Sequence, residues 1–129
     1  MTKRVFKLKT FTLWAKKILS DEQLCAAAVE IQRGMYEADL GAGLCKKRIA
    51  LPGQGKSGAT RTLVAKEGMH GLFFIAGRQK SDPGTDFSDA NVAQAQLIGE
   101  ALQKASAKKL DMLVEEGVLK EICHGCQEN

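Results

Sequence analysis

The sequence predicts a small α+β domain in which helices from both ends of the chain pack on a small, mainly antiparallel β-sheet. First, apolar residues recur with helical spacing near both ends of the 129-residue chain. Second, the middle of the chain holds short runs rich in β-branched and apolar residues, separated by glycine-rich turns. Third, the connections between these runs are short, which favours an antiparallel meander. Strands grouped between helices are typical of an α+β domain.

The N-terminal part begins with an expected strand over residues 4–8 and continues with two helices. The first helix is short and amphipathic, because its apolar residues follow the i, i+3, i+4, i+7 spacing: Phe11, Trp14, Ala15 and Ile18. Ser20-Asp21-Glu22-Gln23 is a capping box, so a second helix is expected to begin there. Gly34 is expected near its end.

The middle of the chain is expected to hold three strands. Residues 44–51 form the first, with Arg48 and Ala50 alternating against Ile49 and Leu51. A glycine-rich loop over residues 52–59 leads to a strand over residues 60–65. After a turn, residues 72–76 are apolar throughout, which indicates a central strand.

The C-terminal part is expected to be helical. Ser88 caps a long helix that extends to about Ala105, and a second helix over residues 106–116 stops at Gly117. Residues 118–122 form either a final strand or an extended tail. We expect one domain over residues 1–129, with 118–129 a loosely ordered tail.

The net charge of +4 is mildly basic, but the charge is unevenly distributed. Between residues 41 and 66 there are no acidic residues and six basic ones: Lys46, Lys47, Arg48, Lys56, Arg61 and Lys66. Such a segment indicates a polyanion site, and a solvated basic face is the alternative. No apolar run approaches the ~20 residues of a membrane helix, and no secretory signal begins the chain. We therefore expect a cytoplasmic protein without membrane partners.

The four cysteines are expected to be reduced thiols, because nothing indicates export. Cys25 lies in an apolar helical pattern and is expected in the core. Cys123-His124-Gly125-Cys126 contains a C-x-x-C, but it lacks the histidine that follows the second cysteine in haem attachment and a fourth ligand for zinc. We expect no metal and no cofactor.

The stretch Ala50-Leu51-Pro52-Gly53-Gln54-Gly55-Lys56-Ser57 nearly matches the phosphate-binding P-loop, with alanine in place of its first glycine. A P-loop must lead into a helix, whereas T-R-T-L-V follows here and favours a strand. No later apolar strand ends in an acidic residue that could hold magnesium. The pattern therefore excludes a nucleotide hydrolase and indicates a glycine-rich connection that exposes Lys56.

Several stretches resemble the RelE/HigB-like toxins of bacterial type II toxin–antitoxin systems. The most specific block reads A-D-L-G-A-G-L over residues 38–44, K-K-R-I-A over 46–50, P-G-Q-G-K-S-G over 52–58 and R-T-L over 61–63. The resemblance covers nearly the whole chain and includes the strand with Phe73-Phe74. It implies a compact α+β fold and metal-independent cleavage of mRNA in the ribosomal A site. It also implies inhibition by a cognate antitoxin, commonly a helix-turn-helix DNA-binding protein.

RNA cleavage by transesterification needs a base, cations at the phosphate and a proton for the leaving oxygen. His70 and His124 lie outside the basic segment, and the resemblance implies that lysine and arginine do this work. Our catalytic candidates are Arg61 as phosphate clamp, Arg48 as second phosphate contact, Lys56 as base or phosphate contact, and Lys80 by its place after the last meander strand. The expected RNA-binding residues are Lys46, Lys47, Ser57 and Lys66. Each could instead be a solvated surface residue.

Two aromatic positions that are usual in the family are absent here. The chain has Ala59-Thr60 before Arg61, and Ala76 before Gly77. An aromatic ring at such a place could stack on an mRNA base. Their absence leaves weak activity, a changed codon preference or a degenerate toxin as alternatives. The alternative from another class is a protein that does not cut RNA: a gyrase inhibitor like the ParE-type relatives, or an RNA-binding protein.

Overall fold

The computed structural model describes residues 3–51, 55–84 and 86–123, with the backbone alone for 55–59. Within these ranges the chain forms four helices and six strands. None of the helices found there is both long and apolar enough to cross a membrane. In chain order the elements are β1 Arg4–Leu8, α1 Lys9–Ala15, α2 Asp21–Gln32, β2 Ala38–Gly41, β3 Leu44–Leu51, β4 Gly55–Ala65, β5 Gly71–Arg78, α3 Asp89–Gln103, α4 Ala107–Glu115 and β6 Leu119–Ile122.

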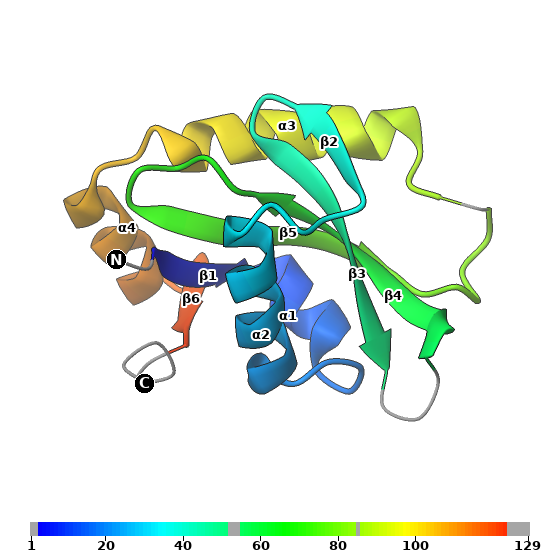
Figure 1. Ribbon diagram of the computed structural model, residues 1–129. Coiled ribbons are helices and arrows are strands. Elements are labelled where there is room, and N and C mark those ends of the chain that lie inside the picture. The colour runs from blue at the N-terminus through cyan, green and yellow to red at the C-terminus, as the bar shows by residue number, and fades with distance from the viewer. Residues whose placement is uncertain (1–2, 52–54, 85, 124–129) are drawn as a thin grey trace.

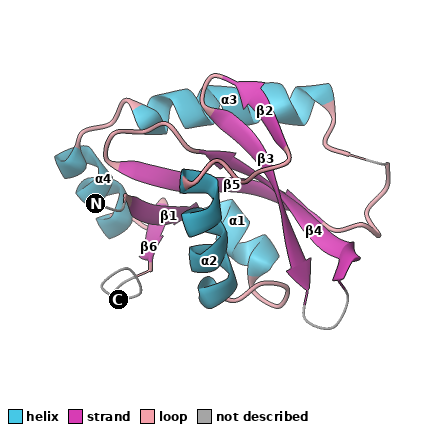
Figure 2. Cartoon of the chain, in the orientation of Figure 1, coloured by secondary structure: helices cyan, strands magenta, loops and turns pink. Residues whose placement is uncertain are grey.

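The strands form one sheet in the order β2-β3-β4-β5-β1-β6 (Figure 2). Strands β3, β4 and β5 pair antiparallel in chain order, which confirms the predicted meander. The N-terminal strand β1 pairs parallel with β5, with Val5 opposite Leu72, and antiparallel with β6. The sheet is therefore mainly antiparallel, and the predicted α+β class is confirmed.

Helices cover both faces of the sheet, with α2 in front and α3 behind in the view of Figure 1. On one face, Phe11 of α1 and Leu24 of α2 belong to a buried cluster with Val64 and Phe74 of the sheet. On the other face, Leu102 of α3 and Leu110 of α4 join a second buried cluster. Side chains alternate along each strand, so every central strand supplies residues to both clusters. We call the side of the sheet with the first cluster the α1/α2 face and the side with the second cluster the α3/α4 face.

Three serines begin the longer helices, two of them at positions that the sequence predicts. Ser20 accepts a hydrogen bond from the amide of Gln23 at 3.1 Å, and the Gln23 side chain accepts one from the Ser20 amide at 2.8 Å, which completes the capping box. Ser88 caps α3 and Ser106 caps α4, each accepting from the amide three residues later at 3.1 Å. These bonds satisfy amides that have no partner in the first turn.

The strands extend further than the sequence indicates. Strand β2 was not predicted, because its glycine-rich segment lies at the sheet edge and pairs only with β3. Strand β4 begins at Gly55 and pairs with Leu51, so residues 55–59 are strand and not loop. Residues 119–122 form β6, paired with β1, so of the two alternatives expected for residues 118–122 the structure has the final strand. In each case pairing with a neighbouring strand overrides weak local preference.

The expectation of four reduced thiols is wrong, because Cys25 and Cys123 form a disulfide with their Cα atoms 5.5 Å apart. β6 runs beside β1, and this pairing brings the cysteine that follows it against α2. A separation of 98 residues hides such a pairing from the sequence. Cys45 is a free, buried thiol, and burial raises its pKa to about 12. His124 and Cys126 lie outside the described residues.

Candidate nucleic-acid interface

Three arginines stand in register across the meander. Arg48 of β3 lies opposite Arg61 of β4, and Arg61 lies opposite Arg78 of β5. Directly opposed residues of antiparallel strands project to the same side of the sheet. Arg48, Arg61 and Arg78 therefore form a line of positive charge across three adjacent strands, which we call the arginine row.

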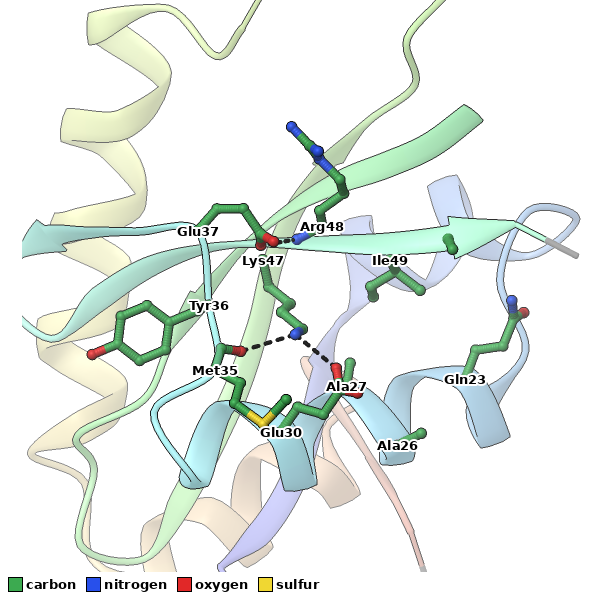
Figure 3. Close-up of a pocket in the computed structure, with 11 residues that line it drawn as sticks. Gln23, Ala26, Ala27, Glu30, Met35, Tyr36, Glu37, Lys47, Arg48 and Ile49 are labelled. Atoms are coloured by element: carbon green, nitrogen blue, oxygen red, sulfur yellow. Dashed lines mark hydrogen bonds and ion pairs between the residues drawn. The ribbon is translucent and has the colours of Figure 1, made fainter. Parts of the chain in front are cut away.

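The arginine row lies on the α3/α4 face, toward the hairpin end of β3 and β4. Leu63 lies two residues after Arg61 on β4, so it faces the same side of the sheet, and it belongs to the α3/α4 cluster and pairs with Lys46. Figure 3 shows the side chain of Arg48 directed away from α2, while that of Lys47 is directed toward α2. The strand period of two residues thus sends adjacent basic side chains to opposite faces.

Arg48 and Arg61 are half-buried, and their guanidinium groups make no hydrogen bond or ion pair within the described part of the chain. The backbone amide of Arg48 donates to the Glu37 carboxylate at 2.6 Å, which fixes the outer edge of β3. A half-buried guanidinium retains five donors in a fixed planar geometry, which suits the oxygens of a phosphate. These two arginines are therefore available to bind an anion.

Arg78 is engaged within the chain. Its Nη1 donates to the carbonyl of Asp86 at 2.6 Å, and its Nη2 is within 3.0 Å of the carbonyls of Asp82, Pro83 and Gly84. It thereby holds the segment that follows β5. Sequence reasoning did not select Arg78, because the strand was expected to end at Ala76. The arginine directly after Gly77 was the only available signal.

Lys46 lies on the same face as the arginine row. Its Nζ donates a hydrogen bond to the Asp86 carboxylate, and the two side chains are 22% and 43% exposed. This pair lies at the edge of the row, beside a cavity of about 260 Å³ that Phe87 and Val92 help to line. The structure thus brings together three of the predicted residues: Lys46, Arg48 and Arg61.

Lys47 and Lys66 are held elsewhere. Lys47 Nζ lies 2.7 Å from a Glu30 carboxylate oxygen and donates to the Met35 carbonyl at 2.8 Å, on the α1/α2 face (Figure 3). This ion pair forms one wall of a cavity of about 580 Å³ between α2 and β3. Lys66 lies 3.3 Å from Asp39 and 3.1 Å from Glu67. Burial alone would lower the pKa of Lys66, but its bonds to these carboxylates raise it. Both lysines join elements of the fold.

The remaining candidates are placed less completely. Lys80 is exposed in the turn after β5, two residues beyond the arginine row. The backbone of Lys56 and Ser57 belongs to β4, but their side chains lie outside the described part of the structure. His70 is exposed at the opposite end of the β4–β5 hairpin from Arg61. Among the described residues, no group of three or more His, Cys, Asp or Glu side chains could hold a metal ion.

A comparison with known protein families identifies the family of this chain. Residues 3–122 match the family described as the RelE toxin of the RelE / RelB toxin-antitoxin system. The chain belongs to the RelE toxin family. The resemblance carried by residues 38–63 is thereby confirmed, and membership of the RelE toxins implies an antitoxin as a partner in general. No curated protein matches the chain.

Proposed function

We propose that this RelE toxin is a metal-independent endoribonuclease that cleaves mRNA on the ribosome and so inhibits translation. The observation that supports this most is the arginine row, in which Arg61 is the central member and is free to bind an anion. A basic strand surface of this kind recognises the nucleic-acid backbone, whose phosphates supply most of the affinity.

The proposed chemistry is attack of a ribose 2′-oxygen on the adjacent phosphorus. The phosphorus–5′-oxygen bond breaks, which leaves a 2′,3′-cyclic phosphate and a 5′-hydroxyl. Arg61 would bind the non-bridging oxygens through two parallel N–H bonds, with Arg48 as a second contact. This stabilises the negative charge that grows in the transition state.

Two proton transfers complete the reaction. A neutral lysine takes the proton of the 2′-hydroxyl, and a protonated group delivers one to the 5′-oxygen. Lys56 and Lys80 are our candidates, since Lys56 lies at the start of β4 and Lys80 follows β5, and both strands carry members of the arginine row. Neighbouring positive charge favours the neutral form of a lysine, which makes the base role chemically feasible.

The proposed partners are the ribosome, mRNA and a cognate antitoxin of the helix-turn-helix class, all in the cytoplasm. Lys46 and Ser57 are proposed RNA contacts. We leave Lys47 and Lys66 out of the RNA site, because their ammonium groups are bound to carboxylates within the fold. An adjacent small reading frame for a helix-turn-helix protein would support this partnership.

The test is Arg61→Ala compared with Arg33→Ala, an exposed arginine beyond the end of α2 that makes the same change of charge. We expect Arg61→Ala to lower mRNA cleavage by about 10²- to 10³-fold, the typical effect of removing one preorganised donor, and to relieve growth inhibition. Arg33→Ala should cleave as the wild type does. Urea unfolding checks that both variants are folded.

Primer extension on translated mRNA gives the decisive readout. Codon-phased cuts that disappear in Arg61→Ala support the nuclease. A folded Arg61→Ala protein with full cleavage and toxicity would contradict the proposal. Growth inhibition without cuts, accompanied by DNA damage, would favour the gyrase inhibitor, and inhibition with RNA binding alone would favour the non-cutting RNA-binding protein.

A further inference from the structure

Asp86 places a negative charge at the edge of the arginine row. Its carboxylate accepts a hydrogen bond from Lys46 Nζ and another from the amide of Phe87 at 2.8 Å. The Asp86 side chain is 43% exposed, so water and solutes reach it. Lys46, which shares the face of the arginine row with Arg48 and Arg61, is therefore already paired with an anion.

The electrostatics of this carboxylate follow from its neighbours. Burial acts to raise the pKa of Asp86, but the bonds from Lys46 and the Phe87 amide, together with the charges of Lys46 and Arg61, lower it. The group is consequently ionised at neutral pH. Arg61 acts on it through its charge without a hydrogen bond, as it would act on a nearby phosphate.

The position of Asp86 is set by Arg78. The four carbonyls that Arg78 binds belong to the segment from Asp82 to Asp86, and one of them is the carbonyl of Asp86 itself. The Asp82 carboxylate also accepts from the amide of Gln79 at 2.8 Å, which closes the turn after β5. Arg78, the third arginine of the row, thus presents the carboxylate to Lys46 and Arg61.

The Lys46–Asp86 pair differs from the other lysine pairs of the basic segment. The side chains of Lys47 and Lys66 are 7% and 10% exposed, so their carboxylate partners stabilise buried ammonium groups. The side chain of Lys46 is 22% exposed and does not need an internal partner to the same degree. An exposed ion pair contributes little to stability, so a role of Asp86 in folding explains its place poorly.

We propose that Asp86 is an intramolecular competitor of the RNA phosphate: it occupies Lys46 beside Arg61, and RNA must displace it to gain the full set of cations. This inference rests on the proposed function, since it assumes that the arginine row binds RNA. The need to displace Asp86 from Lys46 weakens RNA binding and makes the site selective for a ligand that brings several phosphates at once.

The test measures binding of a short single-stranded oligoribonucleotide with 2′-O-methyl sugars, which cannot be cleaved by attack of the 2′-oxygen. We expect Asp86→Asn to bind about two- to tenfold more tightly at moderate salt, as one more lysine becomes available to a phosphate. The dependence of log K on log salt concentration should become steeper by about 0.7, the value for one more phosphate contact on a single strand. Asp86→Ser serves as a second neutral variant.

The matched control is Asp89→Asn, which makes the same change of charge three residues away. Asp89 lines the same cavity but forms no ion pair with Lys46 among the described residues. It should change affinity by less than about twofold and leave the salt slope unchanged, because Asp89 occupies no lysine of this surface and its loss makes no further cation available to a phosphate. In the double variant Lys46→Met/Asp86→Asn, the steeper dependence of log K on log salt concentration that Asp86→Asn produces should be lost.

The outcomes separate this inference from the proposed function. If Asp86→Asn and Asp86→Ser bind no more tightly than the wild type, or Asp89→Asn gains equally, the competitor role is wrong. If that happens while Arg61→Ala loses affinity, the RNA site stands without it. If Arg61→Ala keeps both RNA affinity and cleavage, the RNA site itself is refuted, and the competitor role with it.

Discussion

Lys46 and Lys47 are adjacent in sequence, and we expect opposite consequences when each is replaced. The buried ammonium of Lys47 joins the Glu30 carboxylate to the Met35 carbonyl. Lys47→Met keeps most of the side-chain stem and leaves that carbonyl without its partner, at a cost of about 1–3 kcal/mol. Lys47→Ala also removes three buried methylenes at ~0.8 kcal/mol each. Its total cost is therefore about 3–5 kcal/mol, a large part of the stability of a small domain.

The assay is urea unfolding in parallel with oligoribonucleotide binding. Lys47→Met should lower the free energy of unfolding and leave RNA affinity and its salt slope unchanged. Lys46→Met should cost less than about 1 kcal/mol, as expected for an exposed ion pair, and should weaken RNA binding. The assignment of Lys47 to stability and of Lys46 to RNA binding would be refuted by a Lys47→Ala protein that is as stable as the wild type and whose RNA affinity depends less steeply on salt. Lys47 would then belong to the RNA site.

Two further predictions concern the α1/α2 face of the sheet. Gly77→Ala should destabilise the protein by about 1–3 kcal/mol, measured by thermal or urea unfolding, because the added Cβ would lie 2.1 Å from the ring of Trp14; an unchanged midpoint would show that the ring moves freely. Cys45 should resist alkylation in the native protein at mildly alkaline pH, because it is buried and its pKa is raised to about 12. Mass spectrometry of its peptide should show modification only after unfolding, and rapid native labelling would contradict this.

Much of the fold was predictable because its signals are local. The capping serines Ser20 and Ser88 were readable from the sequence, since a cap depends on residues three positions apart. The strand of residues 44–51 was predicted with the bounds that the structure has. The pairing of β1 with β5 and β6 was not predictable, because nothing local in residues 4–8 specifies neighbours that follow more than sixty residues later.

The candidate site was predictable only in part, for a related reason. The family resemblance selected Arg48 and Arg61, and strand alternation places Lys46 on their side. Arg78 joins them only through the register of β4 with β5, which includes an irregularity between Leu63 and Val64. Strand alternation in the sequence predicts that Lys47 lies on the opposite face, but it does not predict that Lys47 forms an ion pair with Glu30 there.

The position of β1 between β5 and β6 has a consequence for synthesis on the ribosome. The meander that carries the arginine row pairs strands that are close in sequence, so it can form while the chain is still growing. β1 leaves the ribosome first, yet its inner neighbour is complete only at residue 78 and its outer neighbour only at residue 122. The nascent chain therefore carries its cationic surface before its sheet is closed. The sheet is complete only after residue 122 has been synthesised. The ribosome, which we propose as the target of the toxin, therefore makes the cationic surface well before it completes the fold.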